Sequence, residues 1–365
     1  MAPTIDLSSY DRASLASVLA TAADVDERAS RRVFKAIWQS GVERIEDLPV
    51  RRELRAAIGS VGRLPRLEAD RVLHSADGTT KFLWRLHDGH TIESVLIPDG
   101  DRLTLCMSTQ VGCAMACTFC LTGDLGLIRH LTTAEIARQP LQVQRTLPPG
   151  RRITNLVLMG MGEPLHNLKA LVPALRICLD DDGLVFSHRR ITVSTVGLVP
   201  KMAELAAALP VNLAVSLNAT TEEQRRRIMP ITARHSMAEL LEACRTFPLP
   251  HGKRITFEYV MFEGFNDTLE DAARLYDLLR DIPTKVNLIP YNENPDRPTL
   301  KRPSDAVVKG FQDFLVQRGM STSIRTTRGR DISAACGQLG KAREQIERGI
   351  VDSAEGRQAP SAPTG

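Results

Sequence analysis

A chain of 365 residues with ordinary proportions of apolar and charged side chains can bury a large core, and its net charge of +4 is too small to indicate nucleic-acid binding by itself. It has no apolar run of membrane-spanning length and no signal-peptide pattern at its N-terminus. Its cysteines, seven in all, are odd in number and clustered, which excludes a secreted disulfide framework, so we expect a cytoplasmic protein with reduced thiols.

The N-terminal part is expected to be helical. Between residues 11 and 58, apolar residues such as Leu15, Leu19, Phe34 and Ile37 recur at helical spacing between charged ones. We assign residues 1–66 to a small helical domain. Basic residues outnumber acidic ones between residues 28 and 71, so this domain offers a surface for phosphates, with an ordinary solvated helical surface as the alternative.

Three Asp-Gly pairs follow, at residues 77–78, 88–89 and 99–100, each between β-rich stretches. Asp-Gly readily supplies the positive φ angles of a tight hairpin. We therefore expect a β-meander at residues 67–101 that leads into the rest of the chain.

From residue 103 onward the pattern changes to strand, loop and helix, repeated. Strands are expected at residues 103–108, 155–159, 190–194, 211–216, 255–261 and 285–289, with helical patterns such as 133–144, 168–179 and 269–279 between them. Such βα units form a parallel sheet, either doubly wound or curled into a full or partial barrel. A further β-like segment at 321–325 precedes a last helix near 341–347, and the polar tail at 350–365 is expected to be disordered.

The most specific motif is the group Cys113, Cys117 and Cys120, spaced Cys-x3-Cys-x2-Cys. Three thiolates on one tight loop can hold a [4Fe–4S] cluster and leave one iron open for a small molecule, which is the arrangement of radical S-adenosylmethionine (SAM) enzymes. A structural zinc site is the alternative, but it needs a fourth Cys or His. No histidine lies between Cys113 and His130, and Cys106 sits in an apolar run.

Polar residues follow the expected strands, at the carboxyl ends where parallel βα folds bind ligands. They are the segment Gly-Met-Gly-Glu-Pro at residues 160–164, Ser194 and Thr195, then Ser216, Leu217 and Asn218, and finally Tyr291 and Asn292. Any one of them alone is more typical of a turn or a helix cap. Together with the cysteine loop they predict a polar pocket beside a cluster, in which Glu163 can accept hydrogen bonds from the ammonium group of a methionine moiety.

These motifs, with Cys336 in the late segment Ala-Cys-Gly-Gln-Leu and Cys106 seven residues before Cys113, resemble the RlmN/Cfr family of radical-SAM RNA methyltransferases. The resemblance covers nearly the whole chain. It implies an α/β fold, a partial (β/α)6 barrel at residues 102–349 with a small N-terminal helical domain and a β-hairpin extension. It also implies a SAM site formed by Gly162, Glu163, Ser194, Ser216, Leu217, Asn218 and Asn292. The family usually has His where this chain has Asn218, and an asparagine keeps a donor and an acceptor but cannot titrate.

The resemblance further implies three catalytic residues. The Cys336 thiolate would take a methyl group from one SAM, and a radical from a second SAM would turn that group into a methylene radical that adds to adenine. Cys106 would then resolve the covalent adduct by forming a disulfide with Cys336. Glu93 stands where the family has its proton acceptor, with an outward-facing strand carboxylate as the alternative.

The substrate implied is carbon 2 of an adenosine in 23S rRNA, and a tRNA as a second substrate. Methylation of carbon 8, and a non-catalytic zinc-stabilised RNA-binding protein, are the alternatives. We expect a monomer that does not bind membranes and that needs an electron donor such as flavodoxin or ferredoxin and a disulfide reductant. The candidate contacts with RNA phosphates, each with a merely solvated charge as the alternative, are Arg31, Arg32, Arg51, Arg52, Arg225, Arg226 and Arg227.

Overall fold

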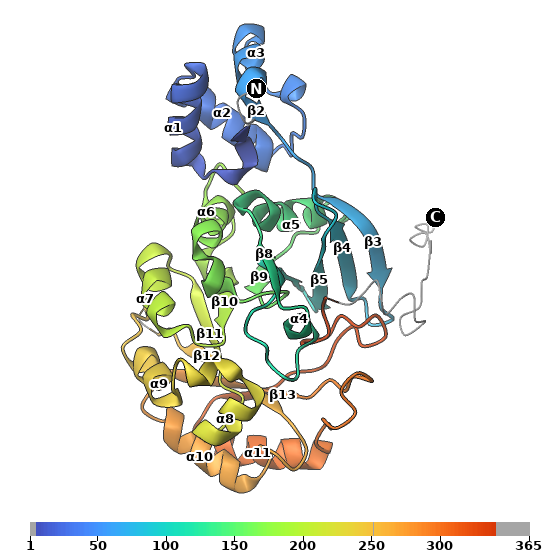
Figure 1. Ribbon diagram of the computed structural model, residues 1–365, viewed down its shortest axis with the longest axis vertical. Helices are drawn as coiled ribbons and strands as arrows, with labels where there is room; N and C mark the ends of the chain where they lie inside the picture. The colour runs from blue at the N-terminus through green and yellow to red at the C-terminus, as the bar shows by residue number, and fades with distance from the viewer. Residues whose placement is uncertain (1–4, 251, 341–365) are drawn as a thin grey trace.

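The computed structural model describes residues 5–250 and 252–340, and one ten-stranded sheet runs through it (Figure 1). Its strands lie in the order β14-β13-β12-β11-β10-β9-β6-β5-β4-β3. Neighbours from β6 to β14 are parallel, and neighbours from β3 to β6 are antiparallel. The parallel strands are β6 (Arg102–Cys106), β9 (Asn155–Leu158), β10 (Ile191–Thr195), β11 (Asn212–Ser216), β12 (Ile255–Met261), β13 (Thr284–Pro290) and β14 (Thr322–Ile324).

Helices connect successive parallel strands, so the α/β class and the six expected βα units are confirmed. The sheet is open, with β14 at one edge and β3 at the other, which makes the barrel partial. The connecting helices are α5 (Thr133–Arg145), α6 (Leu168–Leu179), α7 (Val199–Ala208), α8 (Glu222–Ile228), α9 (Met237–Arg245), α10 (Leu269–Leu279) and α11 (Asp305–Gln317).

Capping residues explain where several of these helices begin. Thr268 accepts a hydrogen bond from the backbone N–H of Asp271, whose carboxylate bonds back to the N–H of Thr268, and α10 starts there. Ser236 and Glu239 form the same reciprocal cap at the start of α9. Such local signals account for the agreement between expected and observed helix starts.

The N-terminal helices α1 (Arg12–Ala23), α2 (Glu27–Trp38) and α3 (Arg52–Val61) lie at one end of the molecule (Figure 1). Asp11 and Asp26 cap α1 and α2 through their carboxylates. Helix α2 buries Phe34, Ile37 and other apolar side chains on one face. The short strands β1 (Ile5–Asp6) and β2 (Gly62–Arg63) pair in parallel and bring the two ends of this helical segment together.

The three Asp-Gly hairpins form as expected and join β3 (Glu68–His74), β4 (Thr80–Arg85), β5 (Thr91–Asp99) and β6. Gly78, Gly89 and Gly100 have φ angles of 84°, 84° and 57°, which glycine adopts at little cost. The meander is not a separate layer, because it continues the same sheet as the parallel strands.

In the described ranges, no helix combines the length and the apolar character that crossing a bilayer requires. The helix expected near residues 341–347 and the tail at 350–365 lie outside the described residues.

Candidate active site

The cysteine loop, residues 113–120, joins β7 (Gln110–Gly112) to α4 (Leu121–Asp124). Strand β7 pairs with β8 (Leu127–His130), a hairpin that the sequence pattern did not predict. The backbone N–H of Cys113 donates to the carbonyl of Gly126 at 2.7 Å, and the N–H of Cys120 donates to the carbonyl of Cys117 at 3.1 Å. Gly112 has a φ angle of 73°, and a Cβ there would lie 1.9 Å from the Gly126 oxygen, so the hairpin needs glycine at this position.

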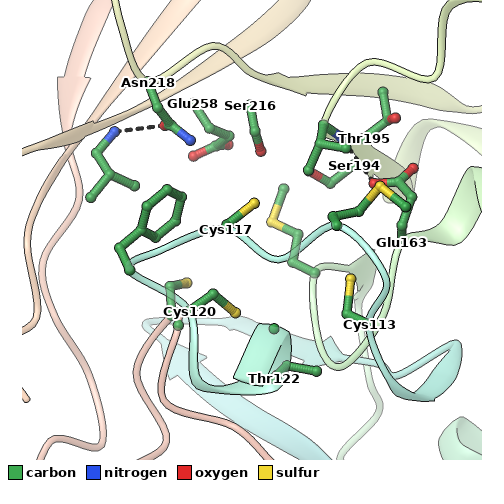
Figure 2. Close-up of a pocket in the computed structure, with 18 of the residues that line it drawn as sticks. Cys113, Cys117, Cys120, Thr122, Glu163, Ser194, Thr195, Ser216, Asn218 and Glu258 are labelled. Atoms are coloured by element: carbon green, nitrogen blue, oxygen red, sulfur yellow. Dashed lines mark hydrogen bonds between the residues drawn. The ribbon is translucent and has the colours of Figure 1, made fainter. Parts of the chain in front are cut away.

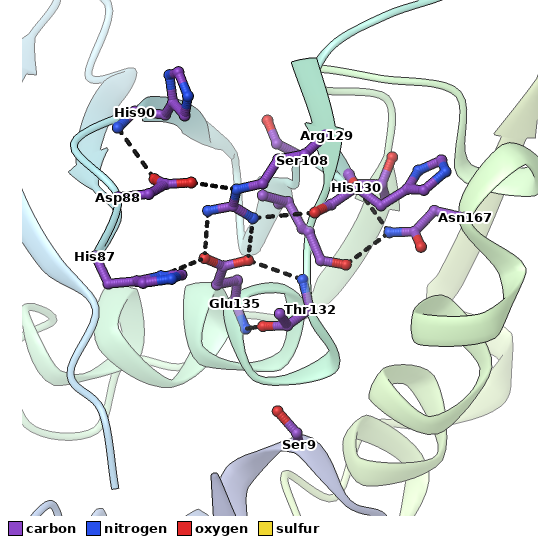
Figure 3. Close-up of polar contacts among 12 residues, drawn as sticks. Ser9, His87, Asp88, His90, Ser108, Arg129, His130, Thr132, Glu135 and Asn167 are labelled. Carbon is purple, nitrogen blue, oxygen red and sulfur yellow. Dashed lines mark hydrogen bonds and ion pairs between the residues drawn. The ribbon is translucent and has the colours of Figure 1, made fainter. Parts of the chain in front are cut away.

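Polar contacts fasten this hairpin to α5 and to the meander (Figure 3). Arg129 in β8 donates two hydrogen bonds of 2.8 Å to Glu135 and one to Asp88 in the turn between β4 and β5. The Asn167 amide donates to two backbone carbonyls next to the hairpin strands, at 2.8 and 2.9 Å. Contacts with neighbouring elements therefore hold the hairpin in place. They position the cysteine loop that it carries against the carboxyl ends of the parallel strands.

Cys113, Cys117 and Cys120 line one pocket, spaced around its wall (Figure 2). In residues 5–250 and 252–340, no three His, Cys, Asp or Glu side chains converge where they could hold a single metal ion. A cubane cluster needs each thiolate on a different iron, whereas zinc needs four ligands on one ion. Three thiols match the ligand number of a cubane with one open iron and are one short of the four ligands of a structural zinc.

Burial raises the pKa of all three thiols, to about 12 for Cys113 and well above its ordinary value for Cys117. Without a metal these groups are protonated at neutral pH. Since the thiolate is the ligand, metal binding must displace their protons.

Glu163 follows β9 and lines the same pocket as the cysteine loop (Figure 2). Its Oε2 accepts from the N–H of Val196 at 3.0 Å, and its Oε1 from the N–H of Leu165 at 3.1 Å. Burial raises its pKa to about 7, and these backbone donors oppose the rise. Gly162 has a φ angle of 101°, and a Cβ there would lie 2.6 Å from Gln110 Cβ, which explains the glycine before Glu163.

The structure brings five of the seven expected SAM-site residues to this pocket, namely Gly162, Glu163, Ser194, Ser216 and Asn218. Leu217 is fully buried and does not line it. Asn292 lines a neighbouring small cavity, where its amide donates to the carbonyl of Cys336 at 3.3 Å.

Asn218 is held by contacts at both ends of its amide. Its Oδ1 accepts from the N–H of Val260 at 2.9 Å, and its Nδ2 donates to Met229 Sδ at 3.3 Å. Its φ angle is 59°, a conformation that asparagine tolerates better than most residues.

Cys336 lines the same pocket as the three cluster cysteines, on a loop that follows β14. This loop is bound directly to α4, the helix that follows the cysteine loop. The N–H of Leu121 donates to the carbonyl of Gly337 at 2.8 Å, and the Thr122 hydroxyl donates to the carbonyl of Leu339 at 2.7 Å. Two segments that are more than 200 residues apart in sequence thus form one site.

Cys106 ends β6 and is buried behind the pocket. Burial and, next, the neighbouring Cys336 raise its pKa to about 12, while Arg325 lowers it. Arg325 itself lines the pocket together with Cys336, and the charges of Cys336, Glu258 and Cys106 raise its pKa. One guanidinium therefore interacts with both of the extra cysteines.

Glu93 is only 3 % exposed, so the outward-facing alternative is wrong. Its Oε2 lies 3.2 Å from Lys81 Nζ, and its Oε1 accepts from the N–H of Gly340 at 2.8 Å. Through its hydrogen bond with Gly340, Glu93 helps to hold the loop that carries Cys336.

Sequence reasoning missed Glu258 and Arg325, which line the pocket, whereas the expected place of Thr195 there is confirmed. Glu258 was detectable as the one acidic residue in the strand Ile255–Met261, and its pKa is raised by burial. Arg325 carried no local signal, because it follows a short strand and precedes a segment rich in arginine.

The arginines that were expected to contact RNA phosphates separate into exposed residues and one buried residue. Arg31, Arg32, Arg51 and Arg52 are exposed on or beside the N-terminal helices, and Arg226 and Arg227 are exposed on α8. Arg225 is 1 % exposed, so it cannot contact an RNA phosphate, and that prediction is wrong.

Residues 107–279 match the family model described as the Radical SAM superfamily. The chain is also similar to the crystal structure of a radical SAM methyltransferase from Sphaerobacter thermophilus, with 40% identity and a TM-score of 0.86 over 92% of this chain and 99% of that one. The fold and the three-cysteine pocket are therefore those of a radical-SAM enzyme.

Relatives named "Dual-specificity RNA methyltransferase RlmN" extend this match. The one from Geotalea uraniireducens is 50% identical over 324 residues, which is 88% of this chain and 92% of the relative. The one from Anaeromyxobacter sp. is 49% identical over 344 residues, 92% of this chain and 91% of the relative. The chain belongs to the RlmN family of radical-SAM RNA methyltransferases. It is an enzyme, so the alternative of a non-catalytic zinc protein is set aside.

Proposed function

We propose that this enzyme methylates carbon 2 of an adenosine in large-subunit ribosomal RNA, with Cys336 as the carrier of the methyl group. The observation that supports this most strongly is the position of Cys336, which lines the same pocket as Cys113, Cys117 and Cys120. The relatives are named dual-specificity RNA methyltransferases, which supports tRNA as a second substrate.

The pocket divides into two parts. Cys113, Cys117 and Cys120 would hold a [4Fe–4S] cluster, which when bound supplies the electron that cleaves SAM and begins the radical chemistry. On the wall formed by the loops that follow the parallel strands, ionised Glu163 would accept hydrogen bonds from the ammonium group of SAM. Ser194 and Ser216 would contact its carboxylate and ribose, and Asn218, Leu217 and Asn292 would support this wall.

Cys336 would carry the methyl group to a carbon atom that cannot take it from SAM directly. Carbon 2 of adenine is electrophilic and carries hydrogen, so a nucleophilic attack on the SAM methyl group is not available to it. The Cys336 thiolate would first attack that methyl group, forming a sulfur–carbon bond while the bond to the SAM sulfur breaks. Removal of one hydrogen atom from the S-methyl group would then leave a methylene radical, which adds to carbon 2.

Release of the product requires two further groups. The adduct radical would give one electron to the cluster, which was oxidised when SAM was cleaved, and Glu93 would take the proton from carbon 2. The Cys106 thiolate would then attack the sulfur of Cys336, breaking the bond between that sulfur and the methylene carbon, which takes up a proton to become the methyl group. The resulting disulfide would be reopened by a cellular reductant.

The electrostatics of Cys106 suit this order of events. Its pKa of about 12 keeps the thiol protonated in the resting enzyme. Alkylation of Cys336 removes one of the two contributions that raise this pKa, and the opposing contribution of Arg325 remains. Cys106 would therefore become a better nucleophile once Cys336 has been alkylated, first in the methylated enzyme and then in the adduct.

The remaining partners are inferred from these steps. An electron donor such as flavodoxin or ferredoxin must reduce the cluster. The exposed arginines of the N-terminal helices would contact RNA phosphates, and the target adenosine must leave its stack to reach Cys336.

Mass spectrometry of nucleosides from ribosomal and transfer RNA tests the proposal. RNA from a strain that lacks this gene should contain less 2-methyladenosine than RNA from the complemented strain. Loss of 8-methyladenosine with 2-methyladenosine unchanged would establish the carbon-8 alternative, and no change in either would overturn the proposal.

A further inference from the structure

Arg225 is a buried cation without a buried anion. It lies in α8, its side chain is 1 % exposed, and in the part of the chain that the structure describes no carboxylate lies within ion-pair distance of it. Removing a guanidinium from water is strongly unfavourable unless a negative group compensates its charge. Burial lowers the pKa of Arg225 to about 10, so it still carries its charge at neutral pH.

Its guanidinium is bonded to the ends of two neighbouring parallel strands. Nε donates to the carbonyl of Leu217 at 3.2 Å, and Nη2 donates to the carbonyls of Ser216 at 3.2 Å and Val196 at 2.5 Å. Nη1 donates to the Thr232 hydroxyl at 2.9 Å. These neutral acceptors satisfy the donors but do not neutralise the charge.

The same guanidinium is linked to both walls of the pocket. Val196, which accepts from Arg225, donates its own N–H to Glu163 Oε2 at 3.0 Å. One turn after Arg225, the carbonyl of Ile228 accepts from the N–H of Thr118 in the cysteine loop at 3.0 Å. Met229 and Ile228 pack with Cys117 in one apolar cluster.

The cysteine loop can supply the charge opposite to that of Arg225. Among the groups that act on the charge of Arg225, Cys117 is the largest that favours it, and Arg225 in turn lowers the pKa of that thiol. A cluster bound to Cys117 would place negative charge against the end of α8, where Ile228 and Met229 pack on that cysteine.

We propose that Arg225 is the internal counter-charge of the iron–sulfur cluster, placed under Cys117 to favour the reduced form. This inference rests on the proposed cluster site. Reduction adds one negative charge to a group already bound by three thiolates, and a fixed cation behind that group lowers the free energy of the reduced state. Arg225 thus acts on the reaction through the cluster, by means of its positive charge. Its hydrogen bonds to the two strand ends hold that charge in position.

The midpoint potential of the cluster tests this inference. Wild type, Arg225→Lys, Arg225→Met and the exposed neighbour Arg226→Met would be reconstituted anaerobically, and their iron and sulfide contents measured first. A redox titration followed by electron paramagnetic resonance then gives each potential. Iron-free wild type would refute the cluster proposal itself, a result distinct from any result on Arg225.

In Arg225→Met, the ratio of oxidised to reduced cluster at a given potential should be at least tenfold higher than in wild type. For a one-electron couple this corresponds to a midpoint potential about 59 mV more negative. Arg225→Lys should stay near wild type because it keeps the charge, although it loses the planar fork of donors. Arg226→Met should not shift. Should Arg225→Met fail to fold, Arg225→Gln replaces it, since its amide can still donate to two carbonyls. Equal potentials in the lysine variant and the neutral variant would overturn the inference.

Discussion

Lys81 and Glu93 form an ion pair on the adjacent strands β4 and β5, with 3.2 Å between Lys81 Nζ and Glu93 Oε2 and with the lysine side chain fully buried. Lys81 Nζ also donates to the carbonyl of Ser333 at 3.1 Å, and Glu93 Oε1 accepts from the N–H of Gly340. The pair therefore fastens the loop that carries Cys336 on both sides of that residue.

Lys81→Met should destabilise the protein by about 3 to 5 kcal/mol, because it removes the cationic partner of a buried carboxylate. It should also loosen the Cys336 loop and reduce methylation of Cys336. Urea unfolding measures the first effect, and peptide mass spectrometry of the Cys336 segment measures the second. The double variant Lys81→Met/Glu93→Leu should recover much of the stability without recovering turnover. Full activity in the double variant would contradict the role proposed for Glu93.

Each of Cys113→Ala, Cys117→Ala and Cys120→Ala should abolish cluster binding and SAM cleavage, since two thiolates do not hold a cubane stably. Cys178→Ala is the control, because Cys178 is a buried thiol that lies in α6 and does not line the pocket. Iron and sulfide analysis after anaerobic reconstitution makes the comparison. A cluster-cysteine variant with the iron content of the control would disprove the assignment.

The raised pKa of Glu163 predicts how the stability of the protein depends on pH when neither cluster nor SAM is bound. Its pKa in the folded state, about 7, lies above its ordinary value of 4.5, so the folded state binds the proton more tightly. The resulting stabilisation is fully present below pH 4.5 and is lost as the pH rises through 7, by on the order of 3 kcal/mol. Glu163→Gln should remove this part of the pH dependence in urea unfolding experiments. The same slope in both proteins would show that Glu163 is not the group responsible.

Local patterns predicted the secondary structure well where local physics decides it. Strand β12 and helices α6 and α10 begin and end at the expected residues, because hydrophobic periodicity marks all three and a capping box fixes the start of α10. The convergence of the Cys loop, Glu163 and Ser216 on one pocket followed from the rule that parallel strands present their carboxyl ends at one edge.

What could not be predicted depends on contacts between distant segments. The run Arg225, Arg226 and Arg227 looks like a solvated charge cluster, yet a seven-residue helix turns the first of these residues inward and the other two outward. Lys81 and Glu93 lie on a meander that gives no local sign of a buried ion pair. In both cases the partner groups are backbone carbonyls or N–H groups, which sequence patterns do not reveal.

Trapping of RNA by Cys106→Ala tests the central claim most directly, since Cys336 must become bonded to adenine before Cys106 acts. The reconstituted variant, given SAM, a reductant and substrate RNA, should add the methylene group once and then stall. It should leave a protein–RNA complex that withstands denaturant, disappears on nuclease digestion, and carries its crosslink on Cys336 in peptide mass spectrometry. Cys336→Ala should keep the cluster and form no such complex. Normal turnover by Cys106→Ala, or the same crosslink in Cys336→Ala, would contradict the account.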